Sequence, residues 1–131
     1  MKQITKEWLV AANDDLLIIK EIIDMEYLTH LVAFHAQQSL EKSLKALMEE
    51  FFGEVPRVHN LVKLSTSVSA YISLDTEKEF ELLEELDKLY IDARYPGDMG
   101  LLPSGKPTIK EAENFYDFAL YLYNEVKNIL D

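Results

Sequence analysis

Residues 31–52 read LVAFHAQQSLEKSLKALMEEFF, and this stretch decides the fold. Its apolar residues recur at three- and four-residue intervals, which is the period of an amphipathic helix. Gly53 follows directly, and glycine tolerates the positive φ at which many helices end. We therefore predict a helix over residues 31–52, with an apolar face formed by Ala33, Ala36, Leu40, Leu44, Leu47 and Phe51.

The opposite side of the same helix has a polar row, spaced 3, 4, 3, 4, that comprises His35, Gln38, Lys42, Lys45 and Glu49. One interpretation is a solvated face with local pairs such as Glu41–Lys45. The other is a groove that holds an anion or a purine, because lysines neutralise phosphate and a glutamine amide both donates and accepts hydrogen bonds. The residues alone leave both open.

The same periodicity predicts helices over residues 5–24, 76–93 and 109–130, and a shorter, weaker one over 59–70. Thr5 is the expected N-cap of the first helix, and S/T-x-x-E capping boxes at Thr76–Glu79 and Thr108–Glu111 open the later two. No convincing strand pattern remains. We expect an all-α, up-and-down four-helix bundle with an additional short helix, in one domain over residues 1–131. A less regular five-helix array is the alternative.

The predicted last helix is apolar around most of its circumference. One face contains Ala112, Phe115 and Ala119, whereas Tyr116, Phe118 and Tyr121 point in other directions. Such a helix usually has a second buried side. We expect a homodimer interface there, and a large monomeric core is the alternative.

Composition limits the function classes. The chain has 131 residues, a formal net charge of −11 and no cysteine. The absence of cysteine excludes disulfides and thiolate sites, and no apolar run is long enough for a membrane span. We expect a cytoplasmic protein with no membrane association. The acidity disfavours constitutive binding to nucleic acid, and DNA in particular.

Motifs for metals and phosphates are missing. The three histidines are His30, His35 and His59, and none belongs to a Glu-x-x-His pair or an H-E-x-x-H motif. The four glycines form no phosphate-binding loop. We therefore expect neither a metal nor a cofactor, and we interpret the histidines as polar helix-face or capping residues.

Arg94-Tyr95 precedes a Pro-Gly break at the end of the helix over residues 76–93. Arg94 could satisfy the last helical carbonyls, or its planar fork could hold a phosphate or carboxylate. The loop over residues 98–107 follows, and loops of this length often have a functional role.

Three segments together resemble one family. The run HAQQSLEKSLKAL at residues 35–47 strongly resembles the second-helix signature of HEPN domains. His59-Asn60-Leu61-x-x-Leu64 and Tyr90-x-x-x-Arg94-Tyr95-Pro96 resemble the next two landmarks of that family, in the same order and at matching spacing. The resemblance implies a helical bundle, usually dimeric, that associates with nucleotides or RNA. Small prokaryotic members are often encoded beside a minimal nucleotidyltransferase, in a toxin–antitoxin-like pair.

Many HEPN proteins are metal-independent ribonucleases with an Arg-x(4–6)-His motif, and this sequence departs from it. No histidine follows Arg94 at that spacing. We therefore predict no catalytic residue, and a nucleotide-binding or partner-binding protein that acts with a nucleotidyltransferase. An endoribonuclease toxin is the alternative. The expected ligand-binding residues are Gln38, Lys42, Lys45, His59, Arg94 and Tyr95.

Overall fold

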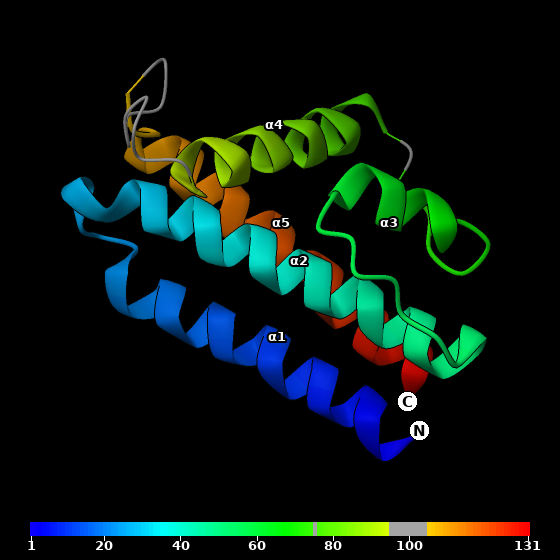
Figure 1. Cartoon of the computed structure of the whole chain (residues 1–131). Coiled ribbons are helices and arrows are strands. Elements are labelled where there is room, and N and C mark those ends of the chain that lie inside the picture. The colour runs from blue at the N-terminus through cyan, green and yellow to red at the C-terminus, as the bar shows by residue number, and fades with distance from the viewer. Residues whose placement is uncertain (75, 95–104) are drawn as a thin grey trace.

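Four long helices and two short ones make up the structure, a computed structural model that describes residues 1–74, 76–94 and 105–131, with residues 92–94 described by their backbone alone (Figure 1). No strand occurs in these ranges, which confirms the all-α expectation. In chain order the helices are α1 (Gln3–Ile22), η1 (Glu26–Leu28), α2 (Thr29–Phe52), α3 (Leu61–Ser67), α4 (Glu77–Arg94) and α5 (Ile109–Leu130).

The predicted helix ends are confirmed where the sequence has a strong cap. Gly53 closes α2 at φ 73°, and its N–H donates to the Glu49 carbonyl. Thr108 opens α5 with a full capping box, in which the Glu111 N–H donates to the threonine hydroxyl over 3.1 Å. Thr76 accepts the Glu79 N–H over the same distance of 3.1 Å. These bonds satisfy backbone groups that have no partner within the helix.

The predicted N-cap at Thr5 is wrong. The first helix begins at Gln3, so Thr5 lies inside its first turns and is fully buried. The Thr5 hydroxyl instead donates to Glu50 Oε1 of α2 over 2.9 Å. Hydrogen bonds from the Lys2 amide and from Thr5 lower the pKa of Glu50. Thr5 thus ties two helices together instead of starting one.

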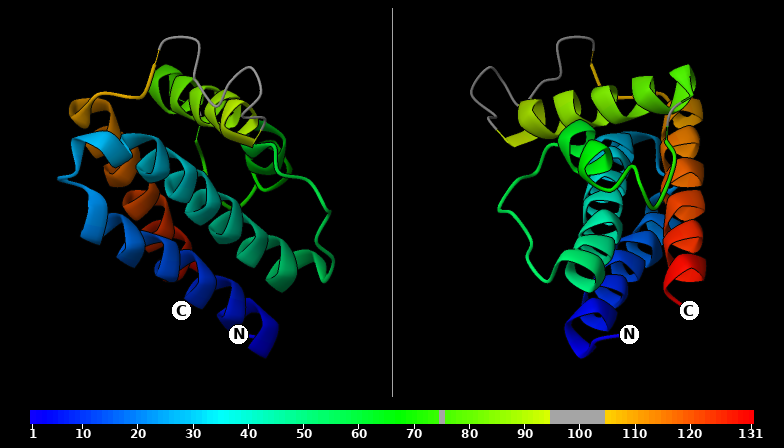
Figure 2. Two further views of the ribbon diagram at one scale, coloured as in Figure 1. Left: turned by 60° about the vertical axis from the view of Figure 1, so that its left-hand side comes forward. Right: turned by 90° about the vertical axis from the view of Figure 1, so that its right-hand side faces the viewer.

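The helix α2 is the centre of the arrangement, because it contacts α1, η1, α3, α4 and α5. The helices α1, α2 and α5 run beside one another, and α4 lies across α2 and α5 with α3 next to it (Figures 1 and 2). Both chain termini lie at the same end of the molecule (Figure 1). A helix surrounded in this way has few positions that face water.

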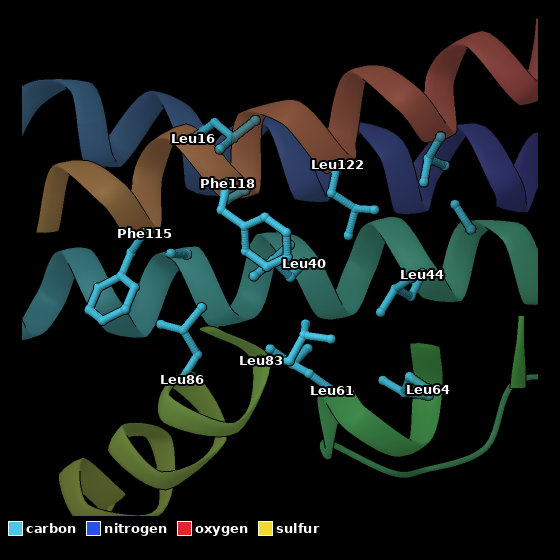
Figure 3. Close-up of a cluster of buried hydrophobic side chains, with 14 of the residues drawn as sticks. Leu16, Leu40, Leu44, Leu61, Leu64, Leu83, Leu86, Phe115, Phe118 and Leu122 are labelled. Carbon is cyan, nitrogen blue, oxygen red and sulfur yellow. The ribbon is translucent and has the colours of Figure 1, made fainter. Parts of the chain in front are cut away.

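Side chains from all five α-helices meet in one hydrophobic core (Figure 3). Leu40 and Leu44 of α2 are both fully buried; Leu40 lies beside Phe118 of α5, and Leu44 lies above Leu64 of α3 (Figure 3). The predicted apolar face of α2 is buried along most of its length. Phe51 is the exception, because it is 41% exposed near the end of the helix.

The second apolar side of α5 is partly buried within the chain. Phe118 points from α5 toward Leu40 and is only 7% exposed (Figure 3). Tyr121, by contrast, is 49% exposed. The core therefore accounts for one of the residues that suggested a dimer interface, and the homodimer remains a prediction.

None of the helices in the described residues is long and apolar enough to cross a membrane.

The central position of α2 predicts a large cost for Leu40→Ala. This change removes a side chain with no exposed surface, and such truncations cost about 2–5 kcal/mol of unfolding free energy. The matched control is Leu17→Ala, because Leu17 is 50% exposed and its truncation should change stability by less than about 0.5 kcal/mol. Urea denaturation of both variants is the measurement, and equal effects would contradict the placement of α2.

Candidate functional site

The polar row of α2 does not face bulk water. Lys45 is only 4% exposed, and the Lys42 side chain is 26% exposed. A buried cation is costly unless an anion pairs with it. Both lysines have such a partner, and the partners divide the row into two clusters.

The Asp15 cluster, Asp15 with His35 and Lys42, joins α1 to α2. Lys42 Nζ lies 2.8 Å from Asp15 Oδ2, and His35 Nδ1 lies 2.9 Å from Asp15 Oδ1. The Asp15 side chain is 8% exposed, and both of its oxygens are bonded within the chain. Close by, the Ser39 hydroxyl donates to the Ala12 carbonyl over 3.0 Å. This cluster neutralises Lys42, one of the two lysines that were expected to hold an anion.

Sequence reasoning missed Asp15, although a signal was present. Asp15 lies three residues after Ala12 and four before Ile19, both of which are fully buried. That spacing puts a carboxylate at the edge of the buried face. A buried carboxylate needs a cation or hydrogen-bond donors, so the lysines of α2 were the natural partners to consider.

The Glu41 cluster, Glu41 with Gln37, Lys45 and His59, joins α2 to the segment before α3. Lys45 Nζ donates to Glu41 Oε2 over 2.9 Å, and both side chains are nearly fully buried. Gln37 Nε2 donates to Glu41 Oε1 over 3.3 Å and to the His59 carbonyl over 2.8 Å. His59 Nδ1 is 3.1 Å from each oxygen of Glu41. The carboxylate therefore fixes the segment before α3 against α2.

Gln38 extends this cluster toward the surface. Its amide nitrogen donates to Gln37 Oε1 over 2.7 Å. Gln38 is partly buried, and through Gln37 it connects to Glu41. Of the predicted site residues with described side chains, Gln38, Lys45 and His59 are brought together, whereas Lys42 belongs to the Asp15 cluster.

His59 is the most accessible member of either cluster. Its side chain is 50% exposed, although Glu41 holds its Nδ1. The other ring nitrogen, Nε2, has no hydrogen bond to any described residue. An imidazole oriented by a carboxylate on one side and open on the other can bond to a ligand or exchange a proton with it.

A row of aromatic rings continues from His59. The rings of His59 and Tyr90 have centroids 5.7 Å apart, and Tyr90 and Phe34 are stacked at 6.0 Å. Phe34 in turn meets His35 edge-on at 5.2 Å. This aromatic row, His59–Tyr90–Phe34, crosses from the start of α3 to α4 and α2. Partly exposed rings in such a row offer π-faces on which a nucleic-acid base can stack.

A shallow pocket of about 200 Å³ opens beside the row and is lined by His59, Asn60, Asp87, Tyr90 and Ile91. Asp87 accepts the N–H groups of Leu61 and Val62 at the start of α3. The pKa of Asp87 is raised overall, chiefly because the carboxyl group is buried. The hydrogen bonds from Leu61 and Val62 lower this pKa in part, and the charge of Glu41 raises it further. The pocket, called the His59 pocket below, thus has an apolar wall and a carboxylate already bonded to backbone.

The remaining histidine, His30, belongs to neither cluster. Its Nδ1 is buried without a partner among the described residues, and burial together with nearby Lys106 lowers its pKa. Lys106 itself donates to the Tyr27 carbonyl over 2.7 Å. Within the described part of the chain, no group of three or more acidic or histidine side chains is placed to hold a metal ion.

Two predicted site residues lie outside this geometry. The side chain of Arg94 and the whole of Tyr95 are outside the described residues, as is most of the loop over residues 98–107. The backbone of Arg94 ends α4, one helical turn after Tyr90. Position 94 therefore follows the His59 pocket along the same helix.

A comparison with protein families shows which family the chain belongs to. The family model described as "HEPN domain" matches residues 5–129. The chain is also similar to a solved structure, the crystal structure of TT1696 from Thermus thermophilus, with a TM-score of 0.73 and 28% identity over 95% of this chain and 97% of that chain. No match was found among the curated proteins.

The Asp15 cluster predicts unequal effects for two neighbouring substitutions. Asp15→Asn removes the charge that pairs Lys42 and should lower the free energy of unfolding by about 1–3 kcal/mol, because a part-buried cation loses its partner. Asp14→Asn, one residue earlier and exposed, should change it by less than about 0.5 kcal/mol. Chemical denaturation at neutral pH measures both. Indistinguishable midpoints would show that the pair contributes nothing.

Proposed function

Because the chain belongs to the HEPN domain family, we propose that it is a nucleotide-binding protein without catalysis of its own, which acts with a minimal nucleotidyltransferase in a toxin–antitoxin-like pair. The observation that carries the nucleotide part is the half-exposed His59, held by Glu41 beside Tyr90. The partner and the pairing follow from the family resemblance.

The geometry favours the His59 pocket over the lysines as the place of contact. Lys42 and Lys45 are each within 2.9 Å of a carboxylate oxygen, so their charges are already neutralised. A base can instead stack on the aromatic row, and His59 Nε2 can bond to it or to a phosphate. Gln38 would help to shape the site through its hydrogen bond to Gln37. Arg94 stays the proposed cation for the phosphate, with Tyr95 next to it.

Calorimetric titration with AMP, ATP and GTP tests this site through matched pairs of variants. We expect His59→Ala and Tyr90→Ala each to weaken binding at least about fivefold, because losing one stacking partner costs about 1–3 kcal/mol. The controls are His35→Ala, whose imidazole bonds to Asp15, and Tyr121→Ala, which lies exposed on α5.

Affinity should survive in both controls. Loss of binding in His35→Ala but not in His59→Ala would move the site to the Asp15 cluster. If the wild-type protein binds none of these nucleotides, the nucleotide part of the proposal is wrong. The proposed association with a nucleotidyltransferase would then remain, and co-purification of the two proteins tests it.

A metal-independent endoribonuclease is the second candidate, and the contact between His59 and Glu41 is the observation that favours it. The sequence lacks the histidine that family ribonucleases have after the arginine. His59, however, presents an imidazole beside Tyr90, and Tyr90 lies one helical turn before Arg94 on α4. An imidazole oriented by a carboxylate can accept the proton of a 2′-hydroxyl as that oxygen attacks phosphorus. The bond from phosphorus to the 5′-oxygen breaks, a 2′,3′-cyclic phosphate forms, and the imidazolium or water protonates the departing 5′-oxygen.

This candidate predicts RNA cleavage that persists in EDTA and falls at least about 100-fold in His59→Ala, which is the scale of general acid–base catalysis. His35→Ala is again the matched control and should cleave like the wild type. If purified protein leaves labelled RNA intact, or if His59→Ala cleaves as fast as the wild type, this second function is wrong.

A further inference from the structure

The outward face of α1 is unusually apolar for a surface helix of this chain. Among the described residues α1 packs mainly on α2 and also touches α5, and its remaining side faces outward (Figures 1 and 2). Four large aliphatic side chains on it are 42–60% exposed: Ile4, Val10, Leu17 and Ile18. No other helix in the described ranges exposes as many. Single exposed apolar residues are ordinary, but a set on one edge helix is not.

Carboxylates alternate with two of these aliphatic residues. Glu7, Val10, Asp14, Leu17 and Glu21 follow one another at intervals of 3, 4, 3 and 4, so they form one stripe along the helix. All five are exposed. None of the three carboxylates makes an ion pair with any described residue, in contrast to Asp15 on the inner side of the same helix. We call these five residues the α1 stripe.

We propose that the α1 stripe is a docking face for an amphipathic helix of a different protein, one that flanks an aliphatic row with lysine or arginine. Val10 and Leu17 would pack against the aliphatic row, and the carboxylates would pair the flanking cations. From Glu7 to Glu21 the stripe spans about 21 Å at 1.5 Å per residue, which matches a partner helix of about four turns.

Charge decides against a second copy of this chain as the occupant. A two-fold dimer through this face would bring the same patch of both subunits together, so Glu7, Asp14 and Glu21 would face further carboxylates. The chain as a whole has a formal net charge of −11, which adds long-range repulsion. The same charge disfavours a nucleic acid or an anionic bilayer. A basic helical partner is the occupant that gains from both the aliphatic residues and the charges.

The α1 stripe is independent of the nucleotide site, because it contains no residue of the His59 pocket or of either cluster. The helix α4 provides an acidic comparison surface on the same molecule. Its exposed carboxylates include Glu81 and Glu84. Two charge reversals on α4 therefore alter the net charge as much as two on α1, without touching Val10 or Leu17.

The test uses a synthetic, fluorescently labelled 15-residue helical peptide, in which leucines at three- and four-residue spacing are flanked by lysines. A control peptide has glutamate in place of each lysine. Fluorescence polarisation with the intact protein should show binding of the lysine peptide only. We expect Glu7→Lys/Asp14→Lys and Val10→Ser/Leu17→Ser each to weaken it at least tenfold. Glu81→Lys/Glu84→Lys should change it less than twofold.

Three outcomes would overturn the proposal. Equal weakening by the α1 and α4 charge reversals would mean attraction by net charge alone. An unchanged affinity in Val10→Ser/Leu17→Ser would mean that the aliphatic residues do not contact the peptide. If the peptide fails to bind and light scattering shows a dimer that Val10→Ser/Leu17→Ser dissociates, the stripe is a self-association face. All the substituted residues are exposed, so we expect each variant to fold, and thermal melts check this.

Discussion

The constraint on which the rest of the structure depends is that α2 is surrounded. It contacts every other helix of the described residues, so the charged side chains of lysine and glutamate on it are poorly hydrated. A buried charge is tolerated when an opposite charge and hydrogen bonds compensate it. Asp15 and Glu41 provide this compensation for Lys42 and Lys45, and in doing so they attach α1 and the segment before α3 to the central helix.

This pairing changes where a ligand can bind. The sequence suggested a basic groove, because lysines recur on one side of α2 in an acidic chain. In the structure those lysines are bonded, and the accessible groups lie where α2, α3 and α4 meet. His59 belongs to both descriptions: Glu41 anchors its Nδ1 in the buried cluster, while half of its side chain remains open to solvent beside Tyr90. Tyr90 and Arg94, which belong to the sequence landmarks of the family resemblance, lie at the same end of α4 as this exposed imidazole.

The sequence was sufficient for the helices and insufficient for the contacts between them. Periodicity and capping residues predicted α2 and α5 almost to the residue, since Gly53, Thr108 and Glu111 act through bonds within a few residues. Thr5 was misassigned because its partner, Glu50, lies 45 positions away. For Asp15 the spacing indicated a carboxylate at the edge of the buried face, but not its partners His35 and Lys42, which are on another helix. The nearness of His59 to Tyr90 likewise arises from tertiary packing, which no local pattern encodes.

The central claim is that ligand contact occurs at the His59 pocket while the lysines of α2 stay in their internal pairs. Side-chain NMR during titration with AMP tests it most directly, by following the imidazole signals of His59 and His35 and the ammonium signals of Lys42 and Lys45. We predict that the His59 signals move with ligand concentration and that those of His35, Lys42 and Lys45 do not. Movement of the two lysines with a stationary His59 would contradict the account.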